Sequence, residues 1–254
     1  MAIVKFSALL AAALLLAWTS PGVAAPIGNI VLVHGAFADG SGWKGVSDIL
    51  VAAGYKVSVA QHPNSSLGDD VAATRSVLDL QDGPAVLVGH SYGGTIITEA
   101  GSHPRVATLV YVAAYAPEAG EDPKALRASR PPVTTNVLPV GDGFIIRQPA
   151  SFAADFAADL PHDLSRFMAY AQVPTSIAAL SSPVKSAAWR TKPSWYIVAS
   201  DDRIINPDLQ RDMANRAGSK TTEIKGSHAV FIAQPAAVAR IIVEASQPAP
   251  RKTP

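Results

Sequence analysis

Short apolar runs alternate with amphipathic segments along most of this chain. Residues 29–34 are almost continuously apolar, which is typical of a strand buried on both faces of a parallel sheet. Further strands are predicted at 55–60, 85–90, 107–114, 194–199 and 221–225. Helices are predicted between them, at 43–53, 69–80, from Ser91 to about 101, at 208–217 and from Pro235 onward. This alternation predicts an α/β fold with a doubly wound, mostly parallel sheet.

The alternation stops between residues 117 and 190, where Pro, Ala and Ser dominate. Only short helices are predicted there, at 151–160, 163–171 and 176–179. The segment is too rich in large apolar side chains for a disordered linker. We interpret it as a small, mainly helical cap inserted over the carboxyl edge of the sheet, where ligands bind in such folds. Residues 25–116 and 191–246 then form the core, and residues 247–254 a mobile tail.

The first residues of the chain have a composition of their own. Lys5 is the only charged residue among the first 25, and an apolar run at 6–18 is followed by Pro, Gly and small residues. This order is typical of a secretory signal peptide, and the run is short for spanning a bilayer. We expect a signal peptide at 1–24 and an exported bacterial protein, periplasmic or secreted, with no stable membrane insertion after cleavage.

Charge and composition exclude several kinds of partner. The 254 residues include 21 Lys and Arg against 20 Asp and Glu, without a basic run, which argues against nucleic acid or an anionic membrane surface. The chain has no Cys, and its six His form no His-x-x-x-His pair. Neither a disulfide framework, nor a metal site, nor another cofactor is therefore predicted.

The sequence Gly89-His90-Ser91-Tyr92-Gly93 lies where the third predicted strand meets its helix. A strand, a tight turn around Ser and a helix form a nucleophile elbow, which holds the Ser side chain above the sheet edge. Side chains at positions 89 and 93 would collide in so tight a turn, which explains Gly there. Gly-x-Ser-x-Gly occurs by chance in about one chain of this length in ten. The prediction of an elbow therefore depends on the strand and the helix that flank the motif.

A serine hydroxyl needs a base to remove its proton, and the base needs a group that orients it. His228 follows the last predicted strand and Asp202 the strand before it. In a parallel sheet both loops emerge at the edge that carries Ser91. Asp202 is preferred over the adjacent Asp201, whose side chain should point the opposite way.

Two backbone N–H groups are expected to form the oxyanion hole, those of Tyr92 and of Ala36 in the loop after the first strand. His34 is expected to support the site through a hydrogen bond, His90 to be structural, and His62, His103 and His162 to lie on the surface. The side chains expected to bind substrate are Phe37, Phe152, Phe156, Phe167, Met168 and Trp189.

Four segments, at 31–43, 89–94, 202–207 and 226–228, together resemble the α/β-hydrolase superfamily. The resemblance covers residues 27–244 and is greatest to the branch with plant methylesterases, hydroxynitrile lyases and bacterial pyrethroid-hydrolase-like esterases. It implies Ser91, Asp202 and His228 as the catalytic triad. Hydroxynitrile lyases of this branch carry Thr and Lys where this chain has Gly35 and Ala229, which favours hydrolysis.

We therefore expect a cofactor-free serine hydrolase that cleaves small to medium apolar carboxylic esters through an acyl-enzyme. Hydroxynitrile-lyase, perhydrolase or cofactor-free oxygenase chemistry on the same triad is the enzymatic alternative. A ligand-binding receptor on a hydrolase scaffold is the alternative from another class, and turnover of a chromogenic ester separates it from an enzyme.

Overall fold

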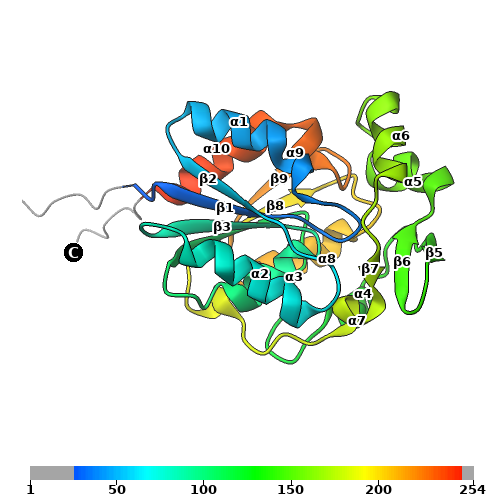
Figure 1. Ribbon diagram of the computed structural model, residues 1–254, viewed down its shortest axis with the longest axis horizontal. Coiled ribbons are helices and arrows are strands. Elements are labelled where there is room, and N and C mark those ends of the chain that lie inside the picture. The colour runs from blue at the N-terminus through cyan, green and yellow to red at the C-terminus, as the bar shows by residue number, and fades with distance from the viewer. Residues whose placement is uncertain (1–25, 248–254) are drawn as a thin grey trace, which may run out of the picture.

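The computed structural model describes residues 26–247, and the predicted signal peptide and nearly all of the predicted tail lie outside them. Six parallel strands form a central sheet in the order β2-β1-β3-β4-β8-β9 (Figure 1). The strands are β1 (Asn29–Val33), β2 (Lys56–Ala60), β3 (Ala85–His90), β4 (Val106–Val112), β8 (Ser194–Ala199) and β9 (Lys220–Ile224). The predicted fold class is confirmed.

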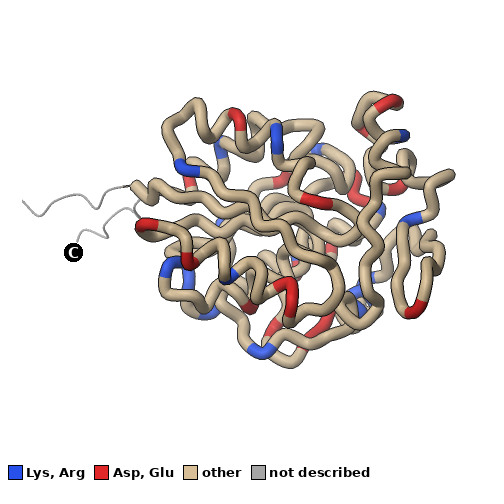
Figure 2. Tube along the Cα trace, viewed as in Figure 1, with Lys and Arg blue, Asp and Glu red and all other residues tan. Residues whose placement is uncertain are grey.

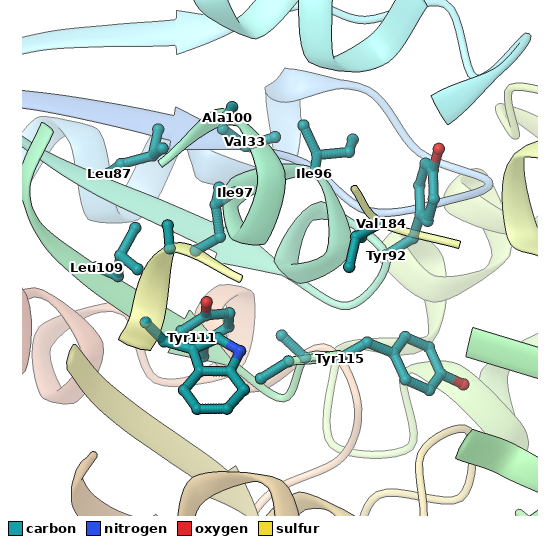
Figure 3. Close-up of a cluster of buried hydrophobic side chains, with 14 of the residues drawn as sticks. Val33, Leu87, Tyr92, Ile96, Ile97, Ala100, Leu109, Tyr111, Tyr115 and Val184 are labelled. Atoms are coloured by element: carbon teal, nitrogen blue, oxygen red, sulfur yellow. The ribbon is translucent and has the colours of Figure 1, made fainter. Parts of the chain in front are cut away.

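Helices cover both faces of the sheet, which is why its central strands are apolar at every position. In β1, Ile30 and Leu32 belong to one core, whereas Val31 and Val33 belong to the other. The first face carries α1 (Lys44–Ala52), α9 (Val230–Ala233) and α10 (Pro235–Ser246), and the second carries α2 (Leu67–Asp79), α3 (Gly93–Ala100) and α8 (Pro207–Arg216) (Figure 1). Figure 3 shows part of the second core.

Between β4 and β8 the chain leaves the sheet, and we call residues 117–190 the insertion. Its helices α4 (Pro123–Ser129), α5 (Pro149–Phe156), α6 (His162–Tyr170) and α7 (Ile177–Ser181) and its strands β5 (Val137–Pro139), β6 (Phe144–Arg147) and β7 (Thr175–Ser176) lie beyond the carboxyl ends of β1 and β3, on the right of Figure 1. Its 3-10 helix η2 (Ala188–Arg190) instead packs against α3, in the second core. A second 3-10 helix, η1 (Gly40–Trp43), precedes α1 in the core.

The insertion contains a small sheet that the sequence did not predict. Strands β5, β6 and β7 pair in antiparallel fashion, and each has only two to four residues. So short an apolar run as the one in β6 cannot be told from a helical segment by its periodicity. Helix α4 was also missed, although Asp122 caps it and Pro123 occupies its first turn, two signals of a helix start.

Charges of both signs are interspersed over the molecule in the view of Figure 2. No helix in the described part of the chain is both long and apolar enough to cross a bilayer.

Candidate active site

The turn between β3 and α3 has the geometry of a nucleophile elbow. Ser91 has a backbone φ of 54°, in the left-handed region that non-glycine residues rarely adopt. A Cβ at Gly89 would lie 2.5 Å from the carbonyl oxygen of Gly93, and one at Gly93 would lie 2.5 Å from that of His34. The steric reason predicted for both glycines is thereby confirmed.

A chain of hydrogen bonds joins Ser91, His228 and Asp202 at the carboxyl edge of the sheet. The His228 Nδ1 atom lies 2.7 Å from Asp202 Oδ2, and His228 Nε2 lies 2.8 Å from Ser91 Oγ. In a neutral imidazole only one nitrogen carries a proton. Because a carboxylate only accepts, Nδ1–H donates to Asp202, which leaves Nε2 free to accept the proton of the Ser91 hydroxyl.

The Asp202 carboxylate is held in place by three further donors. Its Oδ1 atom accepts from the backbone N–H groups of Ile204 and Ile205, at 2.7 and 3.0 Å, and its Oδ2 atom from the Gln210 side chain at 2.8 Å. Asp202 is buried, whereas the neighbouring Asp201 is exposed. The structure thus brings Asp202, not Asp201, to His228.

Two backbone N–H groups lie beside Ser91, those of Ala36 and Tyr92. Ala36 and Tyr92 are buried and line the same pocket as Ser91. Among the described residues, neither N–H donates to a backbone or side-chain acceptor. Since buried N–H groups almost always have a partner, this pair is available to an oxygen that acquires negative charge next to Ser91.

A buried polar network lies behind these two donors. The Tyr92 hydroxyl donates to Asp70 Oδ2 at 2.8 Å, and Asp70 Oδ1 lies 3.4 Å from His62 Nδ1. The His62 Nε2–H donates to the carbonyl of His34 at 3.0 Å, and the two rings stack at 3.6 Å. Burial, together with the neighbouring His62, lowers the pKa of His34 to about 4. The surface position expected for His62 is wrong.

The other histidines lie close to where they were expected. His90 Nε2–H donates to the carbonyl of His228 at 2.9 Å, so its ring supports the loop that carries the base. Burial and the nearby His228 hold the pKa of His90 well below its ordinary value, which keeps the ring neutral. His103 lies 3.0 Å from Asp79 at the surface, and His162 is exposed.

The insertion is hydrogen-bonded to the loop that carries Ala36. Phe37 has a φ of 65°, and its N–H donates to Thr175 Oγ1 at 2.9 Å. The Val173 N–H donates to the Phe37 carbonyl at 3.3 Å, and the Ser176 N–H to the carbonyl of Asn64 at 2.8 Å. The conformation of this loop therefore depends on the insertion.

Of the side chains expected to bind substrate, only Phe37 lines the pocket at Ser91. Phe152 and Phe156 stack on each other and form a separate small core with Met168 at its edge. Phe156 also contacts the His228 ring, with 4.8 Å between ring centroids.

Phe167 and Trp189 lie away from the pocket, contrary to the prediction. Phe167 is 69% exposed, because α6 turns Ser165 and Ala169 inward and Phe167 to the other face. Trp189 is buried in the second core, and its indole N–H donates to the carbonyl of Pro117. Apolar character alone does not tell which face of a short helix a residue occupies.

The pocket at Ser91 is a cavity of about 40 Å³ between the sheet edge and the insertion. It is lined by apolar side chains such as Ile145 and Leu180, and by two arginines, Arg127 and Arg147, that the sequence did not identify. Within residues 26–247, no three His, Asp or Glu side chains are grouped as ligands of a metal ion would be.

Comparisons with known proteins agree with this architecture. Residues 30–241 match the family described as the alpha/beta hydrolase family. A carbendazim-hydrolysing esterase of Nocardioides sp. (strain SG-4G) is 32% identical over 112 residues, which are 39% of this chain and 46% of that protein. A pyrethroid hydrolase of Sphingobium wenxiniae is 26% identical over 246 residues, covering 85% of this chain and 86% of that protein.

Two solved structures share the fold at low sequence identity. Polyneuridine aldehyde esterase is 17% identical, with a TM-score of 0.75 over 86% of this chain and 98% of that one. The methylesterase MES16 from Arabidopsis is also 17% identical, with a TM-score of 0.70 over 85% and 98%. The resemblance to pyrethroid-hydrolase-like esterases and plant methylesterases is therefore confirmed, and this chain belongs to the alpha/beta hydrolase family.

Proposed function

We propose that this protein is a serine hydrolase that cleaves carboxylic esters through an acyl-enzyme. The observation that carries the proposal is the continuous hydrogen-bond chain from Asp202 through His228 to Ser91, beside the two free N–H groups. Relatives described as a pyrethroid hydrolase and a carbendazim-hydrolysing esterase support the same class of reaction.

In the proposed reaction, His228 Nε2 takes the hydroxyl proton while Ser91 Oγ attacks the ester carbonyl carbon. The carbonyl oxygen becomes an oxyanion, which accepts hydrogen bonds from the backbone N–H groups of Ala36 and Tyr92. The imidazolium then protonates the leaving alcohol, and an acyl group remains on Ser91. Water, deprotonated by His228, releases the carboxylic acid by the reverse sequence.

The size of the pocket supports a short ester as substrate. A cavity of about 40 Å³ is far smaller than the roughly 300–1,000 Å³ that holds a drug-sized ligand. Longer acyl groups must displace side chains of the insertion, which should slow the reaction. We expect p-nitrophenyl acetate and butanoate to be cleaved with a higher kcat/KM than the decanoate.

Substitution of the three residues tests the assignment. Ser91→Ala should lower kcat on the order of a million-fold, as loss of the nucleophile does in serine proteases. Asp202→Asn should also lower kcat strongly, because it favours the wrong tautomer of His228. Asp201→Asn is the matched control, since that side chain is exposed, and it should retain the activity of the unchanged protein.

Covalent labelling gives an independent readout of the same assignment. Phenylmethylsulfonyl fluoride should modify Ser91 stoichiometrically, as detected by peptide mass spectrometry. Labelling at another residue, or substantial ester hydrolysis by Ser91→Ala, would contradict the proposal. Binding of esters without turnover would instead identify a receptor.

We also propose that the protein is exported, on the pattern of residues 1–24 alone. Mass spectrometry of protein from the cell envelope should then find an N-terminus near Ala25. A cytoplasmic pool that retains Met1 would contradict export, without affecting the proposed reaction.

A further inference from the structure

Two arginines of the insertion face the cavity at Ser91. Arg127 lies in α4 and Arg147 at the end of β6, and within the described residues no Asp or Glu lines this cavity. Guanidinium groups are charged at every physiological pH. Two of them beside a largely apolar cavity are costly to keep there unless they meet acceptors.

Arg147 is only partly compensated by the protein. It is 4% exposed, its closest carboxylate oxygen is Asp155 Oδ2 at 3.8 Å, and one of its N–H groups donates to Thr134 Oγ1 at 3.4 Å. Asp155 is shared with Arg203 at 3.5 Å. The buried Nε–H of Arg147 donates to no acceptor among residues 26–247. Burial lowers the pKa of Arg147, in line with a charge that lacks full compensation.

Arg127 and Tyr115 add further donors to the same cavity. Arg127 is half-buried, and the described residues provide it with neither an ion pair nor a side-chain hydrogen bond. Tyr115 is buried and lines the cavity, and its hydroxyl likewise has no hydrogen-bond partner in the described chain. Figure 3 shows its ring projecting away from the aliphatic side chains of the cluster. Arg127, Arg147 and Tyr115 thus line one cavity, none of the three has a full set of acceptors among residues 26–247, and no carboxylate of those residues lines it.

We propose that these groups bind a carboxylate of the substrate, so that the preferred substrate is a short ester with an anionic second end. A carboxylate matches the planar guanidinium fork, which can donate two parallel hydrogen bonds to it. Apolar lining residues such as Ile145 and Leu180 suit the methylene groups between the ester and the carboxylate. A monoester of a dicarboxylic acid has this chemistry. The inference rests on the proposed ester hydrolysis and specifies its substrate class.

Matched esters test the inference. We would compare kcat/KM for monomethyl glutarate, which is anionic at pH 7.5, with that for the neutral methyl pentanoate and dimethyl glutarate. The anionic ester should be preferred roughly tenfold or more, as expected for a charge-assisted hydrogen bond in a buried site. Arg127→Gln should lower this preference by a similar factor, because it removes one of the two charges that would bind the carboxylate. Arg127 is half-buried, so its replacement leaves the core unchanged.

Lys124→Gln provides the matched control. Lys124 belongs to the same helix but is exposed and does not line the cavity, so its removal changes the net charge equally. It should leave both the activity and the preference unchanged. Arg147→Lys, checked for folding by its thermal melting curve, should reduce the preference as Arg127→Gln does, since an ammonium lacks the planar fork.

Binding of glutarate separates failure of this inference from failure of the proposed function. Glutarate should inhibit hydrolysis of p-nitrophenyl acetate competitively, and its affinity by calorimetry should fall roughly tenfold or more in Arg127→Gln. Equal rates for anionic and neutral esters, or a preference that survives Arg127→Gln, would overturn the carboxylate site while leaving ester hydrolysis intact. If no ester is cleaved, the proposed function fails, and calorimetry alone decides the site: absence of glutarate binding would overturn it.

Discussion

At the scale of single residues, Asp70 joins the two loops that carry the free N–H groups. Its carboxylate accepts the Tyr92 hydroxyl at 2.8 Å and the Asn64 N–H at 2.9 Å, and it lies beside His62, which holds the carbonyl of His34. The position of both donors relative to Ser91 therefore depends on one buried carboxylate. Its role is invisible in the sequence, where it is one of two acidic residues in the first turn of a helix.

Asp70→Asn should lower kcat with little change in KM. An amide oxygen accepts the Tyr92 hydroxyl more weakly than a carboxylate oxygen does. The backbone N–H groups of Ala36 and Tyr92 are then less well placed for an oxyanion that forms only in the transition state. We expect a loss of roughly tenfold in kcat for p-nitrophenyl acetate. The exposed Asp69→Asn is the control and should retain full activity. A rise in KM at unchanged kcat would show that Asp70 does not position these donors.

Acid should destabilise the protein through its buried histidines. The pKa of His34 is about 4 in the folded state, against 6.5 for an exposed imidazole. Between these two pH values the unfolded chain binds a proton that the folded chain does not. The free energy of unfolding should therefore fall as the pH falls from about 6.5 to 4, by about 3 kcal/mol from His34.

Urea unfolding at pH 7, 6 and 5 measures this loss. His34→Gln should reduce the slope of stability against pH, and His162→Gln, at an exposed position, should leave it unchanged. A stability that is constant over this range would contradict the neutral, buried state of His34. His90, which burial also keeps neutral, should contribute to the loss in the same direction.

The residues that meet at the sheet edge were predictable because each follows the end of a strand. Ser91, Asp202 and His228 come from β3, β8 and β9, and a parallel sheet brings such positions together whatever the loops contain. Arg127 and Arg147 were not predictable. They reach the cavity through the packing of short elements, whose relative placement no periodicity encodes.

At the scale of elements, helices α5 and α6 differ in the exposure of their phenylalanine side chains: those of α5 are buried, whereas Phe167 of α6 is exposed. Phe156→Ala should destabilise the protein by about 3–5 kcal/mol, because that ring is buried against Phe152 and His228. Phe167→Ala removes a ring of the same size from an exposed position and should change stability by less than about 0.5 kcal/mol. Urea unfolding of both variants checks the difference, and equal losses would contradict the placement of α6.

At the scale of the whole molecule, the core was predictable and the insertion was not. Strands buried on both faces need apolar side chains at every position, and this requirement is visible in the sequence of β1 and β3. The insertion is instead held by bonds between distant residues, such as those from Thr134 and Asn136 to Asp155. The near balance of charges over the chain likewise gives no sign of the two arginines that line the cavity.

Because hydrogen bonds join the insertion to the Ala36 loop, the size of the substrate should affect the rate of the reaction more than its binding. An ester too large for the cavity must push the insertion outward, which strains the Thr175 hydrogen bond to Phe37 and the loop that carries the Ala36 donor. Such an ester can still bind, but it reacts slowly while it is bound, so the protein rejects it at the chemical step. Chain length should therefore change kcat more than KM, and Thr175→Val, which lacks that acceptor, should react slowly with short and long esters alike.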